Sequence, residues 1–106
     1  MAKLKCFVGR QRRDGTADIE FVGRRYNRRT TLTVRVPSDK IEIISRGVVR
    51  RGLLECQRRR KWVQYDPDEY RIGCCYHGDP IVWEIEVPTA YGPGIFQVKE
   101  EELVGD

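Results

Sequence analysis

The chain has few of the residues that build helices. Its 106 residues include only three Ala, five Leu and one Met, against eight Ile and eleven Val. β-Branched side chains lose rotamer freedom in a helix and fit the pleated surface of a sheet. The sequence therefore predicts an all-β, mainly antiparallel fold in a single domain, residues 1–106. Apolar segments at spacings of about ten residues indicate six to nine short strands, arranged as a sandwich or a small, partly open barrel.

Long hydrophobic runs are missing as well. No apolar stretch approaches the roughly 20 residues that a membrane-spanning helix needs, so no membrane partner is expected. The first residues, Met-Ala-Lys-Leu-Lys-Cys, do not form the apolar segment of a signal peptide. We therefore expect a cytoplasmic protein, in which disulfides are rare.

Residues typical of catalysis and metal binding are scarce. His77 is the single histidine, and the sequence has neither a Gly-rich phosphate loop nor a nucleophile motif. The four cysteines lack C-x-x-C spacing. Cys75 and His77 would share one face of a strand, but a tetrahedral zinc site would need Cys6 or Cys56 on the same side. We expect a protein that is not an enzyme and that holds no cofactor or metal.

Alternating apolar and polar residues predict the individual strands. The strongest pattern is a hairpin of residues 70–76 and 81–87 around Gly78-Asp79-Pro80, with paired residue numbers that sum to 157, so that Cys74 faces Trp83. A second hairpin joins strands 17–22 and 31–36 through a loop at 23–30. Further strands are expected at 4–8, 62–65 and 95–99.

The segment 38–56 is ambiguous. Ser38 and Asp39 are suitable caps for a helix, and a short helix within 38–56 is one interpretation. Gly47 and Gly52 interrupt the helical pattern, however, and each costs about 1 kcal/mol relative to Ala in a helix. The pair Val48-Val49 also favours extended backbone. A strand or irregular structure is the favoured interpretation.

Charge is divided unevenly along the chain. Residues 1–60 contain 17 basic and 6 acidic residues, a net charge of +11, whereas residues 61–106 contain 3 basic and 10 acidic residues, a net charge of −7. Arg outnumbers Lys fifteen to five. The basic residues gather in three groups: Arg24, Arg25, Arg28 and Arg29 around Tyr26; Arg58, Arg59, Arg60 and Lys61, with Arg50 and Arg51 as an extension; and Arg10, Arg12 and Arg13.

Guanidinium groups bind phosphates through paired hydrogen bonds and stack on bases, and an adjacent aromatic ring adds a stacking surface. The leading hypothesis is a binding module for RNA or single-stranded nucleic acid. Its site would comprise Arg24, Arg25, Tyr26, Arg28, Arg29, Arg58, Arg59, Arg60 and Lys61. The alternative is a structural or adaptor protein, self-assembling or part of a multi-protein or viral particle, that docks through its basic and acidic faces. The leading hypothesis requires arginines that are exposed and not already matched to carboxylates of the second half.

Overall fold

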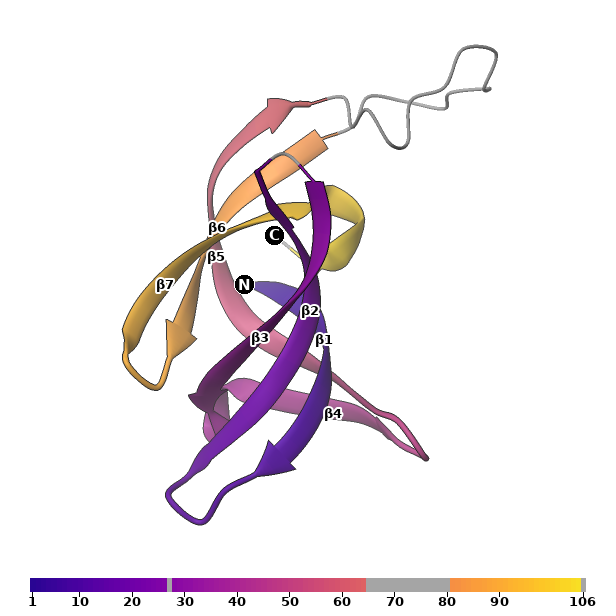
Figure 1. The fold of residues 1–106 in the computed structure, drawn as a ribbon, viewed down its shortest axis with the longest axis vertical. Coiled ribbons are helices and arrows are strands. Elements are labelled where there is room, and N and C mark those ends of the chain that lie inside the picture. Colours follow the sequence, from indigo (N-terminus) through magenta and orange to yellow (C-terminus); the bar gives the residue numbers. More distant parts are fainter. Residues whose placement is uncertain (27, 65–80, 106) are drawn as a thin grey trace.

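The computed structural model describes residues 1–26, 28–64 and 81–105, which form one antiparallel sheet of eight strands (Figure 1). The strands are β1 (Ala2–Gln11), β2 (Thr16–Arg25), β3 (Arg28–Pro37), β4 (Ile41–Arg46), β5 (Arg50–Val63), β6 (Ile81–Thr89), β7 (Gly92–Lys99) and β8 (Leu103–Val104). Two single-turn 3-10 helices, η1 (Ser38–Lys40) and η2 (Glu100–Glu102), precede β4 and β8. The predicted all-β, mainly antiparallel class is confirmed.

Five of these strands close into a barrel in the order β1-β2-β7-β6-β5 and back to β1. β1 makes this closure because it has different neighbours along its length. Its residues 2–7 pair with β5, and its residues 7–11 pair with β2. Outside the ring, β3 pairs with β2, β4 pairs with β5, and β8 pairs with β1.

The seam between β2 and β7 is the narrowest part of the ring. In the described ranges these strands share a single residue pair, Arg24 opposite Gln97. Gly23 precedes this pair, and a Cβ atom there would lie 3.2 Å from the carbonyl oxygen of Gln97 and 2.6 Å from Cδ1 of Leu32. Glycine is therefore the residue that lets the two backbones approach and the barrel close.

Alternation along the strands fills the barrel. In β1, Leu4, Cys6 and Val8 point inward and are buried, while the residues between them face outward. Phe21 of β2 meets Phe96 of β7 edge to face, with ring centroids 5.3 Å apart. Each large apolar side chain removed from water in this way contributes about 1.5–3 kcal/mol.

Two local predictions were wrong. The residues 23–30 do not form a loop, because β2 continues to Arg25 and β3 begins at Arg28. Arginine side chains on the outside of a hairpin stay in water, so their charge does not end a strand. Trp62 and Val63 do not begin a separate strand at 62–65 either, since they are the last residues of the 14-residue β5.

The ambiguous segment 38–56 is mainly extended, as favoured. It forms β4, the turn at 47–49 and the first half of β5, and its only helical part in the structure is the three-residue η1. The first strand of the hairpin expected at 70–76 lies outside the described residues. Its second strand, 81–87, belongs to β6, whose described neighbours are β5 and β7.

Candidate functional site

The first Arg-rich group lies at the end of the β2–β3 hairpin. The register places Arg24 opposite Arg29 and Arg25 opposite Arg28, so the strand pairing continues to the end of the hairpin. Arg25, Arg28 and Arg29 are exposed, whereas Arg24 is only 5% exposed. Arg24 lies at the seam with β7 and is part of the packed structure, so it offers no surface to a ligand. We call Arg25, Tyr26, Arg28 and Arg29 the β2–β3 tip.

The Arg25–Arg28 pair joins two like charges directly across the ladder. Such positions have Cβ atoms about 5 Å apart, and like charges there destabilise a hairpin. Within the described part of the chain neither guanidinium has a carboxylate in ion-pair distance, while Arg29 does have partners in the structure and its charge acts on Glu102. Among the described residues, the Arg25–Arg28 pair therefore presents positive charge that no carboxylate pairs with.

Tyr26 occupies the turn itself. Its side chain is 91% exposed, and its backbone has a φ of 54°. A left-handed conformation at a bulky residue is uncommon, and Gly, Asn or Asp are the usual residues in such a turn. The aromatic ring is thus exposed to water next to Arg25 in the chain, at a position where the backbone would favour a smaller residue.

The second group, Arg58, Arg59, Arg60 and Lys61, forms the β5 cluster. Pairing with β6 brings acidic residues of the second half of the chain against it. Nη1 of Arg59 donates to Oε1 of Glu86 at 2.9 Å, and Nε of Arg60 lies 3.5 Å from Oε2 of Glu84. Two arginines of the cluster are therefore already paired with carboxylates of the same chain.

The other two members of the β5 cluster contact aromatic and backbone groups. The Arg58 guanidinium lies over the Trp83 ring at 4.7 Å, and its Nη2 donates to the carbonyl oxygen of Gly105 at 2.7 Å. Nζ of Lys61 lies 5.7 Å from the same ring. Such cation–π contacts contribute about 0.5–1 kcal/mol at exposed sites, and they fix the side chains on the protein.

The β2–β3 tip and the β5 cluster do not form one patch. Arg24 pairs with Gln97, Gln97 with Glu84, and Glu84 with Arg60. This row spans three strand spacings, about 14 Å, with a carboxylate in the middle. Among the described residues, Arg25 and Arg28 of the tip are exposed and have no carboxylate in ion-pair distance, whereas Arg59 and Arg60 of the β5 cluster are paired with Glu86 and Glu84.

Arg50 and Arg51 do not extend the β5 cluster. They lie at the opposite end of β5, where Arg51 is seven residues, or about 23 Å along the strand, from Arg58. Arg50 instead faces Arg46 across the β4–β5 ladder, and both side chains are exposed. Arg46 and Arg50 were not identified as a pair from the sequence. The signal was the pattern Arg-Gly-Val-Val-Arg at residues 46–50, in which two arginines flank a turn.

The third group, Arg10, Arg12 and Arg13, lies at the end of β1 and in the turn that leads to β2. Nη2 of Arg12 donates to Oδ2 of Asp18 at 3.0 Å, and Nε of Arg35 lies 3.5 Å from Oδ1 of the same carboxylate. The hydrogen bond from Arg12, together with the two positive charges, lowers the pKa of Asp18 below its usual value against the opposing effect of burial. Arg10 and Arg13 remain exposed beside this ion pair.

Metal-ligating side chains do not gather in the described ranges. No three His, Cys, Asp or Glu side chains there are grouped as a metal site. Cys6 and Cys56 are buried free thiols, and burial raises the pKa of each to about 11. Both are therefore protonated and weakly nucleophilic at neutral pH. Cys75 and His77 lie outside the described residues. None of the helices in the described segments has the length and apolarity to cross a membrane.

Searches against protein families, curated proteins and solved structures find no match.

Proposed function

We propose that the protein is a non-catalytic binding module whose β2–β3 tip binds RNA or single-stranded nucleic acid. The observation that carries this proposal is the Arg25–Arg28 pair, two exposed guanidinium groups held opposite each other without a carboxylate among the described residues. Like charges at that spacing oppose folding, and a phosphate between them converts the repulsion into two attractions.

The exposed ring of Tyr26 supports a single strand over a duplex as the ligand. A base that is not already stacked offers its face to an aromatic ring, and such stacking contributes about 1–3 kcal/mol per base. The exposed ring between Arg25 and Arg28 can stack on a base while the guanidinium groups bind the flanking phosphates. This combination favours affinity for the backbone with little dependence on sequence.

The test is a titration of the full chain with a mixed-sequence single-stranded oligonucleotide at several salt concentrations. Two phosphate contacts, from Arg25 and Arg28, predict a slope of about −1.4 for the logarithm of the binding constant against the logarithm of salt concentration. The double substitution Arg25→Ala/Arg28→Ala should weaken binding by about tenfold or more and reduce the slope. The absence of binding at low salt would refute the proposal.

The β4–β5 hairpin supplies a matched control. Arg46→Ala/Arg50→Ala removes another exposed, cross-strand arginine pair and changes the net charge equally. We expect this variant to retain most of the affinity. Equal losses in the two variants would show that net charge, and not the β2–β3 tip, accounts for the binding.

An adaptor role is the second candidate. Docking through separate basic and acidic faces has little support, because Glu84 and Glu86 of the acidic half are already paired with Arg60 and Arg59. The observation that favours an adaptor is a different one: exposed apolar side chains gather beside the β4–β5 hairpin.

A further inference from the structure

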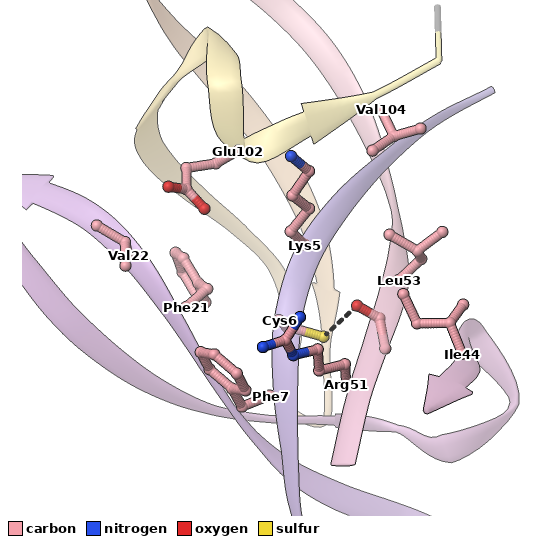
Figure 2. A pocket seen from close by; sticks show the side chains of 11 residues that line it. Lys5, Cys6, Phe7, Phe21, Val22, Ile44, Arg51, Leu53, Glu102 and Val104 are labelled. Atoms are coloured by element: carbon pink, nitrogen blue, oxygen red, sulfur yellow. Dashed lines mark hydrogen bonds between the residues drawn. The ribbon is translucent and has the colours of Figure 1, made fainter. Parts of the chain in front are cut away.

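A groove of about 520 Å³ crosses the outer surface of the barrel (Figure 2). It lies where β1 and β2 meet the β4–β5 hairpin and the C-terminal η2–β8 segment. Its apolar lining includes the outward-facing side chains of Phe7, Val22 and Leu53, with Ile44 and Val104, and the core residues Cys6 and Phe21 also line it. The groove is separate from the β2–β3 tip, since none of the tip residues lines it.

The groove follows from an interruption in the pairing of β1. Along one edge of β1, Lys3 and Leu4 pair with β8. The next residue paired along that edge is Phe7, whose partner lies in β2. In the described ranges Lys5 and Cys6 therefore have a strand neighbour only on their other side, in β5. The surface is hollowed where β1 passes from one neighbour to the next.

Apolar side chains around this groove remain in water. Phe7 is 43% exposed, Ile44 56% and Val104 41%. The turn of the neighbouring hairpin adds Val48 and Val49, which are also exposed. The β4–β5 hairpin projects away from the barrel, so its turn is accessible (Figure 1). Clustered apolar exposure of this kind marks surfaces that a partner covers.

The charges at the groove select the kind of partner. Lys5 and Arg51 lie at the groove, are exposed and have no carboxylate in ion-pair distance in the described segments. Arg46 and Arg50 continue the positive charge along the hairpin. Glu102 is the acidic residue at the groove, and its pKa is raised mainly by burial, then by Glu101. The groove is thus apolar within and mainly positive at its edge.

We propose that this groove is a docking site for an extended segment of a partner protein that combines apolar side chains with carboxylates. The apolar side chains would cover Phe7, Ile44 and Leu53, and the carboxylates would pair with Lys5 and Arg51. A second copy fits poorly, because a symmetric contact would bring the same positive charges together. Nucleic acid fits poorly too, because its phosphates would lie against apolar walls.

Synthetic peptides of about ten residues test the proposal on the full chain. One alternates Val and Glu, a second alternates Val and Lys, and a third alternates Ser and Glu. Chemical shifts of backbone amides locate binding. The Val–Glu peptide should shift Lys5, Phe7, Arg51 and Leu53, and the other two should not. Equal binding of the Val–Lys peptide, or shifts confined to other surfaces, would overturn the proposal.

A charge exchange sharpens the test. Lys5→Glu/Arg51→Glu should lower affinity for the Val–Glu peptide by about tenfold and confer binding of the Val–Lys peptide, since each exposed ion pair contributes up to about 1 kcal/mol. Arg10→Glu/Arg13→Glu makes the same charge change at exposed residues away from the groove and should leave both affinities unchanged. A failure of the exchange with the fold intact would contradict the proposed pairing.

The remaining outcomes separate this site from the nucleic-acid site. Arg25→Ala/Arg28→Ala should leave peptide binding unchanged, and the groove variant should retain oligonucleotide binding at the β2–β3 tip. An oligonucleotide that shifts the groove amides would show that the groove is a nucleic-acid surface. Self-association that Lys5→Glu/Arg51→Glu abolishes would show that a second copy is the occupant. Either result would overturn the peptide-docking proposal.

Discussion

At the scale of single residues, Tyr26 shows a conflict between backbone preference and surface chemistry. Its φ of 54° suits Gly or Asn, and its ring makes the turn aromatic at a fully accessible position. A left-handed conformation at an ordinary L-residue costs about 1–2 kcal/mol. The protein retains a residue that the turn disfavours, which is typical of a functional position.

Tyr26→Asn should therefore separate stability from binding. Asn tolerates the left-handed conformation, so the free energy of unfolding should rise by about 1 kcal/mol in denaturant titrations. Affinity for the oligonucleotide should fall because the stacking surface is lost, whereas Tyr26→Phe should preserve it. A Tyr26→Asn variant that binds as well as the wild type would contradict the stacking role.

The burial of Arg24 was beyond sequence reasoning. Neighbouring Arg25 has the same side chain and is exposed, and the difference arises because β2 meets β7 at Arg24. That contact joins residues 73 positions apart and has no local signal. The exposed members of the tip, by contrast, were predictable from an aromatic residue bracketed by arginine doublets.

At the scale of elements, β6 partly neutralises β5. Glu84 and Glu86 are the two acids in the strand, and each is paired with an arginine of the β5 cluster. The individual strands β3, β6 and β7 could be predicted from alternation, but these ion pairs could not. They depend on the β5–β6 register, which shifts at a bulge between Arg58 and Arg60.

Removing the two acids should expose the charge of the β5 cluster. Glu84→Gln/Glu86→Gln is expected to raise oligonucleotide affinity several-fold at low salt, and each added phosphate contact should steepen the salt slope by about 0.7. Glu42→Gln/Glu55→Gln is the matched control, because it changes the net charge equally and releases Lys3 and Lys40. An equal rise in both variants would indicate a net-charge effect alone.

The β1–β2 and β2–β3 hairpins are linked through Asp18, which predicts a pH dependence. The pKa of Asp18 is lowered in the folded protein by its hydrogen bond with Arg12 and by the charges of Arg12 and Arg35. A lowered pKa means that this contribution to stability is complete above the unfolded value, about 3.9, and is lost as the pH falls through the folded value. In thermal melts, the Tm of Asp18→Asn should be lower than that of the wild type at neutral pH, and the two Tm values should converge in acid. A constant difference down to the lowest pH would contradict this assignment.

At the scale of the whole molecule, closure depends on the approach of β2 to β7. The class of fold was predictable from the excess of Val and Ile, because composition acts on every strand. The closure of the barrel was not predictable from composition, because the strand that pairs with each edge of the sheet depends on register and curvature. The single Arg24–Gln97 pair and the close contact at Gly23 are the features that complete the ring.

Gly23→Ala should destabilise the fold by about 1–3 kcal/mol, because the added methyl group meets Leu32 and the carbonyl of Gln97. Amide hydrogen exchange should accelerate first near Arg24 and Gln97. Gly47→Ala is the control, since a Cβ atom there meets nothing within 4 Å. Its stability should stay within about 0.5 kcal/mol of the wild type. Equal effects of the two substitutions would disprove the role of Gly23 in closure.

The facing arginines of the β2–β3 hairpin also link occupancy to folding. An anion that binds between Arg25 and Arg28 in the folded chain, and not in the unfolded chain, stabilises the fold by an amount set by its affinity and concentration. Conversely, a substitution that makes this end of the hairpin more rigid before binding should raise the affinity for the anion. The ligand-binding pair Arg25–Arg28 thus lies directly beside Arg24, the residue at which β2 meets β7 and the barrel closes.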